Sequence, residues 1–438
     1  MDRRRVGITG LGPVSCVGSG VDAFWSSLLE GTSGLGPIEA FDASGFASKL
    51  AGSVEGIDAK SFVPKSYRKA TKVMARDSEL AVAAAKLATD DAGLKTRGSE
   101  DGDGGFQIVP ERTGCQIGAG LIAAEANELT RALVNSLDDD GRWDVQRWGT
   151  AEGGAQGMNN LPPLWMLKYL PNMLACHVTI IHGCEGPSNT ILAAESSGLL
   201  CLGEGARVIE RHDADISIVG GAESKLNLMG LMRLELLKRL AETGDESDGA
   251  NIVKPYDPGA GGTLLAEGGG ILIIEEMAHA KSRGARVYAE VAGFGASQSD
   301  LRGVEGLELA IESALRDAGA SAADIDAIFP TGLGLPAADT HELGAFEKVF
   351  GDRLGEIPVV SLAPAIGDSM AGQGGLLTAA AALAVHHQTL PARRNAGTPA
   401  DGIDAGASAS RDASLGNVLV CTTALGGQNA AVVLRRAT

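Results

Sequence analysis

The hydrophobic pattern of this chain alternates short apolar runs with longer alanine-rich ones. Arg5 to Thr9 is a short apolar run, which predicts a buried strand that ends in Gly10-Leu11-Gly12. Ser78 to Ala92 carries apolar residues at helical spacing and is followed by Gly93, which predicts a helix with a glycine just beyond its end. Strand-like and helical runs that alternate in this way are typical of an α/β layered fold.

The same order of patterns recurs later in the chain. Val287 to Ala292 leads into Gly293-Phe294-Gly295, and a helical run from about Leu307 closes with Asp317-Ala318-Gly319. A strand, a Gly-x-Gly turn and a helix therefore appear in both parts, which suggests that the chain consists of duplicated halves.

Three segments interrupt these patterns and predict surface loops. Residues 95–111 are rich in Gly, Asp and Ser, residues 125–163 mix a helical stretch with a glycine-rich run, and residues 396–414 are small and polar. We therefore expect an N-terminal half of residues 1–256, with insertions near 95–111 and 125–163, and a C-terminal half of residues 257–438.

Gly10-Leu11-Gly12 after a strand could indicate a dinucleotide-binding turn. Pro13 follows it, Ser15 stands where the third glycine belongs, and no helical pattern opens there. We therefore predict no dinucleotide cofactor.

Two cysteine and histidine neighbourhoods could indicate a metal site. Cys176-His177 and His182-x-Cys184 flank the apolar run Val178 to Ile181, which predicts a strand. Their spacing fits no common zinc pattern, and successive residues on a strand alternate faces. We therefore predict no metal.

Composition restricts the classes of partner. The 438 residues are 44% hydrophobic, as in a globular protein, and the formal net charge of −18 would repel nucleic acid and an anionic membrane surface. To a lesser degree it also disfavours an acidic carrier protein docking on this chain without help.

Met1 to Val6 is basic but leads into a glycine-broken strand, and no run reaches the roughly 18 apolar residues that span a bilayer. We expect a cytoplasmic protein with reduced cysteines.

A series of short motifs follows along the chain. They are Gly7-Ile8-Thr9-Gly10-Leu11-Gly12-Pro13, Phe41-Asp42-Ala43-Ser44-Gly45-Phe46, Leu170-Pro171-Asn172-Met173, Gly186-Pro187-Ser188-Asn189, Gly220-Gly221-Ala222-Glu223, Lys254-Pro255-Tyr256-Asp257 and Gly426-Gly427-Gln428-Asn429. In this order and spacing the chain resembles the β-ketoacyl synthases of the thiolase-like superfamily. The resemblance implies duplicated α/β halves that form a layered α-β-α-β-α core. It also implies a place among the transferases of fatty acid or polyketide biosynthesis.

The resemblance fails at the position of the nucleophile. In condensing enzymes of the family a cysteine begins a long helix, whose dipole and terminal N–H groups lower the thiol pKa. The register from Gly186-Pro187 puts Glu195 at that position, with Ser196-Ser197-Gly198 after it. A carboxylate at a helix N-terminus should stay ionised, and it would repel the carboxylate of a malonyl substrate.

Both catalytic histidines of the family are replaced as well. Its His-Gly-Thr-Gly-Thr motif reads Thr331-Gly332-Leu333-Gly334-Leu335, and its Lys-Ser-x-x-Gly-His motif reads Pro364-Ala365-Ile366-Gly367-Asp368-Ser369. Thr331 and Ser369 thus replace the histidines, and Pro364 replaces the lysine. Hydroxyl groups cannot act as cationic donors to an enolate oxygen at neutral pH, so we expect no condensation by this chain alone.

The track of the carrier arm is altered too. The threonines that line it in the family are Leu333 and Leu335, and the family's Phe-Gly-Phe-Gly-Gly near the channel mouth reads Thr423-Ala424-Leu425-Gly426-Gly427. The resemblance therefore places Leu333, Leu335, Thr423 and Leu425 along the substrate tunnel.

These losses resemble one class within the family, the chain-length factors of type II polyketide synthases. Those subunits pair with an active ketosynthase, lack both histidines and usually carry glutamine where this chain has Glu195. The resemblance implies a non-condensing subunit that forms a heterodimer with the ketosynthase and shapes its acyl tunnel. It also implies that an acyl carrier protein binds through the complex, that its phosphopantetheine arm reaches the partner subunit, and that this chain needs no cofactor.

Other functions fit part of the pattern. The chain could be a homodimeric pseudoenzyme or an acyl-binding scaffold without a ketosynthase partner. It could also be an enzyme that uses Glu195 as a general base, although no histidine accompanies it in the remaining motifs. Glu195 could equally be an ordinary acid in a first helical turn, and Leu333 and Leu425 ordinary core leucines.

Overall fold

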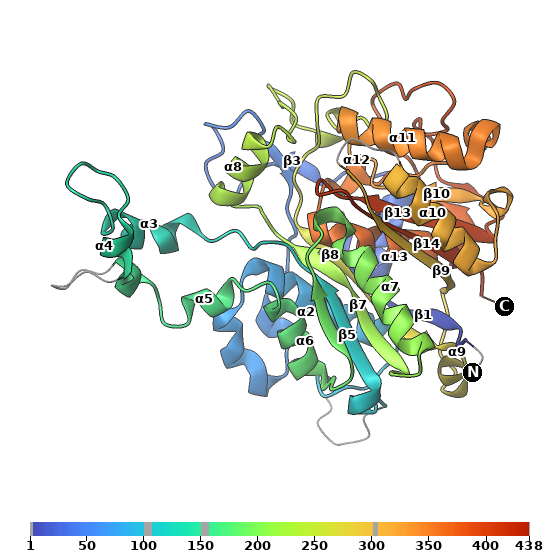
Figure 1. Ribbon diagram of the computed structural model, residues 1–438, viewed down its shortest axis with the longest axis horizontal. Helices are drawn as coiled ribbons and strands as arrows, with labels where there is room; N and C mark the ends of the chain where they lie inside the picture. Colours follow the sequence, from blue (N-terminus) through green and yellow to red (C-terminus); the bar gives the residue numbers. More distant parts are fainter. Residues whose placement is uncertain (1–2, 100–106, 150–156, 301–304, 438) are drawn as a thin grey trace.

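The computed structural model describes residues 3–99, 107–149, 157–300 and 305–437, and its centre is a long mixed sheet (Figure 1). The strands follow the order β10-β13-β14-β9-β1-β8-β7-β5-β6, and β2 pairs with β1. Their bounds are β1 (Val6–Ser15), β2 (Gly18–Ser19), β5 (Thr113–Gly118), β6 (Ser188–Ile191), β7 (Ile216–Glu223), β8 (Gly268–Glu276), β9 (Ala289–Gln298), β10 (Ala327–Phe329), β13 (Asn417–Thr423) and β14 (Gln428–Arg435). The short pairs β3 (Leu35–Pro37) with β4 (Leu50–Gly52), and β11 (Thr389–Leu390) with β12 (Arg411–Asp412), stand apart from it.

Helices form layers on both sides of the strands. The helix α13 (Gln373–His387) is buried along most of its length and packs against α7 (Ser197–Glu210) in the centre. On the outside, α2 (Arg76–Asp91) packs against β1 and β8, and α10 (Glu305–Ala318) packs against β9 and β14. The other helices of the body are α1 (Val21–Glu30), α6 (Met173–His182), α8 (Leu228–Leu236), α9 (Met277–Ser282), α11 (Pro336–Phe350) and α12 (Ala363–Ile366).

The burial of alternate strand residues shows why these layers form. Along β8, Leu272 and Ile274 belong to the core around α7 and α13, whereas Ile271 and Ile273 belong to the core around α2. Because both faces of the strand are covered, its central run Ile271-Leu272-Ile273-Ile274 is apolar without interruption. The predicted layered α/β fold is confirmed. No helix within the described ranges is long and apolar enough to cross a membrane.

Both Gly-x-Gly motifs lie inside strands, where a helix backbone comes close. A Cβ added to Gly12 in β1 would lie 2.0 Å from the carbonyl oxygen of Ala84 in α2, and one added to Gly295 in β9 would lie 2.1 Å from that of Ala310 in α10. The prediction that these motifs form turns is therefore wrong. The glycines lie inside the strands, where the absence of a side chain lets the helix backbone approach. The contact of Gly12 with α2 resembles the contact of Gly295 with α10, which agrees with the expected duplication of the chain. The boundary between the two halves, between residues 256 and 257, stays a prediction.

The apolar run Val178 to Ile181 lies in the helix α6 and not in the predicted strand. Its first and last residues are one helical turn apart, and both are buried in the core beside α2. The neighbouring histidines bond hydroxyl groups of the chain: Nδ1 of His177 lies 2.8 Å from the Tyr67 oxygen, and Nδ1 of His182 lies 2.8 Å from that of Thr96. In the part of the chain that the structure describes, no group of three or more His, Cys, Asp or Glu side chains could hold a metal ion.

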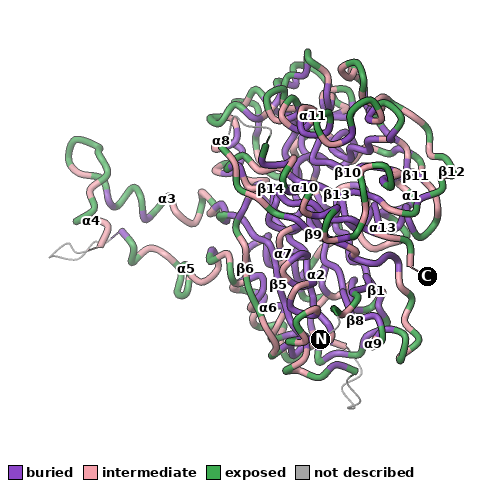
Figure 2. Tube along the Cα trace, turned by 45° about the vertical axis from the view of Figure 1, so that its right-hand side comes forward, coloured by how far each residue is buried: buried purple, intermediate pink, exposed green. Residues whose placement is uncertain are grey.

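Residues 125–149 and 157–170, called the arm below, project from the body of the molecule (Figure 1). They contain α3 (Ala126–Val134), α4 (Val145–Gly149) and α5 (Trp165–Lys168), and most of the arm is exposed or half-buried (Figure 2). The described residues of the predicted surface segment 125–163 belong to the arm. Residues 150–156 of that segment, and residues 100–106 of the predicted segment 95–111, lie outside the described residues.

Candidate functional site

Glu195 lies in a sharp turn between β6 and α7. Ala194 has a φ of 46°, in the left-handed region that is unusual for a residue with a side chain, and α7 begins at Ser197. The turn is held by its neighbours, because Ser197 Oγ accepts a hydrogen bond from the Ala193 N–H at 2.8 Å and Ser196 Oγ donates one to the Gln428 carbonyl at 3.0 Å. A backbone strained in this way persists only where its surroundings over-determine it.

A second turn of the same kind precedes α13. Met370 has a φ of 50°, and Asp368 and Ser369 stand immediately before it. Ser369 is 1% exposed, and its hydroxyl donates to Oε1 of Gln373 at 3.0 Å. The hydroxyl group of Ser369, which replaces the second histidine, is therefore hydrogen-bonded within its own turn.

Arg239 connects the two turns. Its Nη2 donates to a carboxylate oxygen of Glu195 and, at 3.0 Å, to Oδ2 of Asp368. Burial raises the pKa of Glu195, and the guanidinium of Arg239 opposes that rise. Burial also lowers the pKa of Arg239, but Glu195 and Asp368 outweigh it, so that the net direction is upward. The cation that faces Glu195 is therefore this arginine, whereas the sequence predicted stabilisation by the helix terminus alone.

Sequence reasoning missed Arg239. It follows α8 in the leucine-rich stretch Leu236-Leu237-Lys238-Arg239-Leu240, far from Glu195 in the sequence. The one signal available was a charged residue within an apolar run, which also fits a solvent-exposed arginine.

A small cavity of about 140 Å³ adjoins Glu195 and Arg239. It brings together most of the predicted site residues, namely Glu195, Thr331, Leu333, Leu335, Thr423 and Leu425. Ser369 and Pro364 do not line it, because Ser369 is buried in its own turn and Pro364 lies buried in α12. The cavity would hold only about four or five waters at roughly 30 Å³ each, far less than a long acyl chain needs.

Two buried acids hold the loop that carries Thr331. Glu342 accepts from the N–H groups of Thr331 and Gly332 at 3.1 and 3.0 Å, and Asp339 accepts from those of Leu333 and Gly334 at 3.2 and 3.0 Å. Burial and the neighbouring Glu342 raise the pKa of Asp339 to about 7. Both acids are thus committed to the backbone of the loop.

His341 of α11 also lines the cavity. The motifs had predicted no histidine beside Glu195, and this expectation did not consider α11. Within the described ranges no hydrogen bond or ion pair joins His341 to Glu195, and the ionic partner of Glu195 is Arg239. His341 does not therefore complete a general-base arrangement in the structure.

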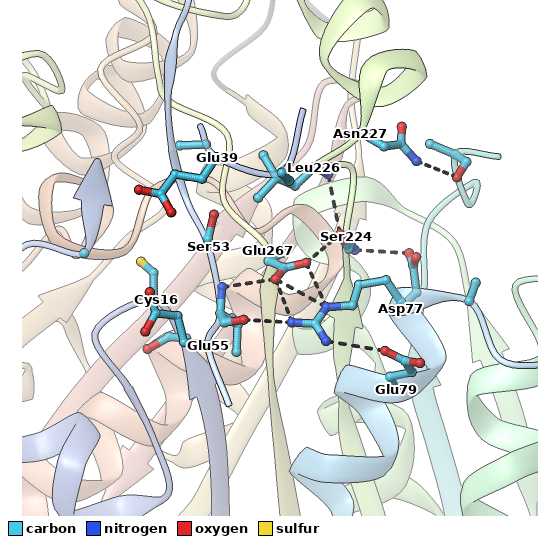
Figure 3. Close-up of a pocket in the computed structure, with 18 of the residues that line it drawn as sticks. Cys16, Glu39, Ser53, Glu55, Asp77, Glu79, Ser224, Leu226, Asn227 and Glu267 are labelled. Atoms are coloured by element: carbon cyan, nitrogen blue, oxygen red, sulfur yellow. Dashed lines mark hydrogen bonds and ion pairs between the residues drawn. The ribbon is translucent and has the colours of Figure 1, made fainter. Parts of the chain in front are cut away.

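A much larger cavity, of about 1110 Å³, lies where the arm joins the body (Figure 3). On its wall Arg76 pairs with Glu267 at 2.9 Å, and Glu267 accepts from the Ser224 hydroxyl at 2.8 Å. The Ser224 N–H in turn donates to Asp77, whose pKa burial raises to about 6. These four polar residues of the wall are therefore linked to one another by hydrogen bonds and an ion pair.

Comparison with known proteins agrees with this architecture. Residues 3–280 match the family model described as "Beta-ketoacyl synthase, N-terminal domain", and residues 288–396 match "Beta-ketoacyl synthase, C-terminal domain". The 3-oxoacyl-[acyl-carrier-protein] synthase 2 of Coxiella burnetii is 32% identical over 446 residues, which cover 100% of this chain and 99% of that protein.

Solved structures of similar fold include two assemblies. "The ishigamide ketosynthase/chain length factor" aligns over 100% of both chains with a TM-score of 0.83 and 28% identity. "AntDE:AntF (apo): type II PKS acyl-carrier protein in complex with its ketosynthase bound to the hexaketide" aligns over 100% of both chains with a TM-score of 0.81 and 25% identity. The fold is therefore the thiolase-like fold of the ketosynthases.

Proposed function

This chain belongs to the β-ketoacyl synthase family, and on that premise we propose that it is a non-condensing, chain-length-factor-like subunit. In this proposal it pairs with an active β-ketoacyl-acyl-carrier-protein synthase and shapes the tunnel that holds the growing chain. The relatives named as synthases share the family and fold of this chain. What this chain can do depends on its own site residues.

The observation that carries the proposal is the buried Arg239 between Glu195 and Asp368. Condensation needs a nucleophile that takes up the acyl group and donors that stabilise the enolate oxygen. Here the nucleophile position holds a carboxylate that is already paired, and Thr331 accepts the Thr423 N–H at 2.9 Å through its hydroxyl. Since removal of one such donor lowers the rate by about 10²–10³-fold, loss of every group leaves no effective condensation.

The exposed apolar surface supports a partner subunit. Many of the exposed large hydrophobic residues lie on the arm: Leu133, Val134, Leu137, Trp143, Val145, Met158, Leu164, Met166 and Leu170. The sheet ends at β6, a half-exposed edge strand, and Leu192 just beyond it is 52% exposed. A projecting apolar arm and an open sheet edge are features that a second chain of the same fold would cover.

The cavity at Glu195 supports an assignment of the tunnel track to this part of the chain, because it brings Leu333, Leu335, Thr423 and Leu425 together. Its small volume fits a track that the partner subunit completes, whereas the charged wall of the large cavity is unsuited to an acyl chain. We assign the phosphopantetheine arm of the carrier to the partner's active site, and no cofactor to this chain.

Co-expression with an active ketosynthase tests the proposal. We expect a one-to-one complex whose condensation requires the cysteine of the ketosynthase, and no condensation by this chain alone. A chain that stays a stable homodimer at micromolar concentration and ignores the ketosynthase would instead favour the scaffold alternative.

A further inference from the structure

The large cavity at the root of the arm has an acidic wall. Among the described residues its wall, with a volume of about 1110 Å³ inside it, carries six acids and two bases, Arg76 and Lys168. Arg76 is paired with Glu267 and Glu79. Lys168 is paired with Glu128, which does not line the cavity. Both bases of the wall are therefore already neutralised by nearby acids.

The other four carboxylates of the wall take part in no ion pair among the described residues. They are Glu39, Glu55, Asp77 and Glu125. All of them except Asp77 are exposed, so they remain charged at neutral pH. Like charges that face one space repel one another, and a cation from outside the chain would relieve that repulsion.

Asp77 is the buried member of this set. It is 2% exposed, and its Oδ1 accepts the Ser224 N–H at 3.1 Å, whereas no hydrogen bond from another described residue reaches Oδ2. Lys225, whose charge acts on Asp77, is itself paired with Glu223. Burial raises the pKa of Asp77 to about 6, so the group is ionised at neutral pH. A buried anionic oxygen without a partner is costly, and a donor placed in the cavity removes that cost.

The cavity fits an organic cation better than a metal ion. Within the described ranges no group of three or more His, Cys, Asp or Glu side chains could hold a metal ion. The volume of about 1110 Å³ equals that of about 37 waters at roughly 30 Å³ each, and it exceeds the range of about 300–1000 Å³ usual for a small-molecule site. A peptide segment with basic side chains has both the size and the charge that the cavity requires.

The cavity adjoins the surface that we assign to the ketosynthase. Glu125, Lys168 and Tyr169, which belong to the arm, form part of its wall. In Figure 3, Glu39 lies on the left of the view and Asp77 on the right, so that acids from separate parts of the chain surround the same space. A subunit that covers the arm would therefore meet this cavity.

We propose that the large cavity receives a basic segment of the ketosynthase partner, whose arginine or lysine side chains pair with Asp77 and with the exposed acids of the wall. The proposal rests on the proposed function, because the segment belongs to the partner subunit. Complementary charges of this kind steer association and fix the register of two surfaces. A second copy of this chain, with a formal net charge of −18, is repelled, so the acidic wall favours a different, basic partner.

A tetra-arginine peptide tests the cavity in the chain alone. The variant Glu39→Lys, Glu55→Lys reverses two exposed acids of the wall. The matched control Asp352→Lys, Glu356→Lys reverses two exposed acids of the 3₁₀ helix Gly351–Glu356, which does not line the cavity. We would measure binding of the fluorescein-labelled peptide by anisotropy at about 0.15 M salt. We expect the first variant to weaken binding by about tenfold or more, and the control to change it by less than about twofold.

Asp77→Asn tests the buried oxygen with almost no change of volume. We expect it to weaken peptide binding by about threefold or more at pH 7, with the fold checked by circular dichroism. The Glu39→Lys, Glu55→Lys variant keeps the test decisive if Asp77→Asn does not fold. The same double variant should also weaken pairing with the co-expressed ketosynthase by about tenfold, as measured by titration calorimetry, and the Asp352→Lys, Glu356→Lys control should not.

The outcomes separate this proposal from the proposed function. Equal losses of peptide binding in the two double variants, or no loss in either, would overturn the cavity as a cation site. Undisturbed pairing of the Glu39→Lys, Glu55→Lys variant with the ketosynthase would overturn the assignment of its occupant, and so would a shift of the chain alone from dimer to monomer in that variant. A wild-type chain that binds the peptide with the expected losses but does not pair with a ketosynthase would sink the proposed function and not the cation site.

Discussion

Arg239 donates a hydrogen bond to Asp368 at 3.0 Å in a place where the two residues are 5% and 1% exposed. Asp368 stands just before the left-handed turn at Met370, and Glu195, the other partner of Arg239, follows the left-handed turn at Ala194. A single guanidinium therefore ties together the starts of α7 and α13. Because both helices lie in the central layer, these ion pairs link the middle of the fold and not its surface.

Removal of Arg239 should destabilise the chain strongly. Arg239→Met would leave two buried carboxylates close together without a counter-charge, and we expect the free energy of unfolding to fall by about 3–5 kcal/mol. Urea denaturation at neutral pH measures this. The matched control adds Glu195→Gln and Asp368→Asn to the same variant and should recover most of the loss. A single variant as stable as the wild type would show that the ion pairs contribute little.

Asp339 should make the stability of the chain fall as pH rises. Its pKa is raised to about 7 in the folded chain, against a usual value near 3.8, so the protonated form stabilises the fold at low pH. That contribution is lost as pH rises from about 4 to about 7, by up to roughly 4 kcal/mol. Relative to Asp339→Asn, the wild type should therefore lose stability between pH 5 and pH 8 in urea denaturation. The exposed Asp352→Asn is the control, and a parallel pH profile for wild type and Asp339→Asn would contradict the prediction.

Restoring a nucleophile should not restore condensation. Glu195→Cys places a thiol beside Arg239, which favours the thiolate, so we expect alkylation by iodoacetamide that slows when Arg239→Met is added. Elongation should still be absent, because Thr331 and Ser369 supply no cationic donor to an enolate oxygen. Mass spectrometry of the treated variant chain checks the alkylation, and mass spectrometry of the carrier-bound products checks the elongation. A β-ketoacyl product from the single variant would mean that the histidine positions are wrongly placed.

Apolar residues of the arm should contribute to binding of the ketosynthase. Trp143 is 52% exposed and lies 6.3 Å from Trp148 between ring centroids, an aromatic pair of the kind that dominates interfaces. We expect Trp143→Ala to weaken the complex by about tenfold or more, as measured by titration calorimetry. Leu309→Ala is a matched control, since Leu309 is 53% exposed on α10 in the body. Equal effects from the two variants would argue against a role for the arm.

The glycines at the strand–helix contacts should not tolerate a side chain. Gly12→Ala and Gly295→Ala would each place a Cβ near 2 Å from a backbone oxygen, and we expect each to destabilise the chain by about 1–3 kcal/mol or more. Gly36→Ala is the control, because no atom lies within 4 Å of its added Cβ. Thermal denaturation by circular dichroism would detect the difference, and a neutral Gly12→Ala would refute the packing described.

The fold could be predicted because the patterns that indicate it are either local to one element or are motifs that follow one another in a fixed order along the chain. The helix predicted over Ser78 to Ala92 corresponds to α2, which begins two residues earlier, at Arg76. The run Val178 to Ile181 was assigned to a strand because a short apolar run looks alike in a buried strand and a buried helix. Gly12 was read as part of a turn because the sequence does not show that a helix backbone passes over it.

The site was predictable only where residues lie in family motifs. Glu195, Thr331 and Leu333, which the register of the motifs selected, line one cavity, and their roles stay a prediction. Arg239 was missed because its two partners come from other parts of the chain, and a long-range ion pair has no spacing to recognise.

The exposed edge at β6 has a consequence for how much of this chain can persist. No strand of the described residues covers its outer side, and the apolar arm lies beside it, so that the edge is open to pairing with an extended strand, including one from another copy. Surplus chain would therefore be drawn into aggregates or degraded. The amount of folded chain would therefore depend on the amount of the protein that covers this edge, as well as on the rate at which the chain itself is made.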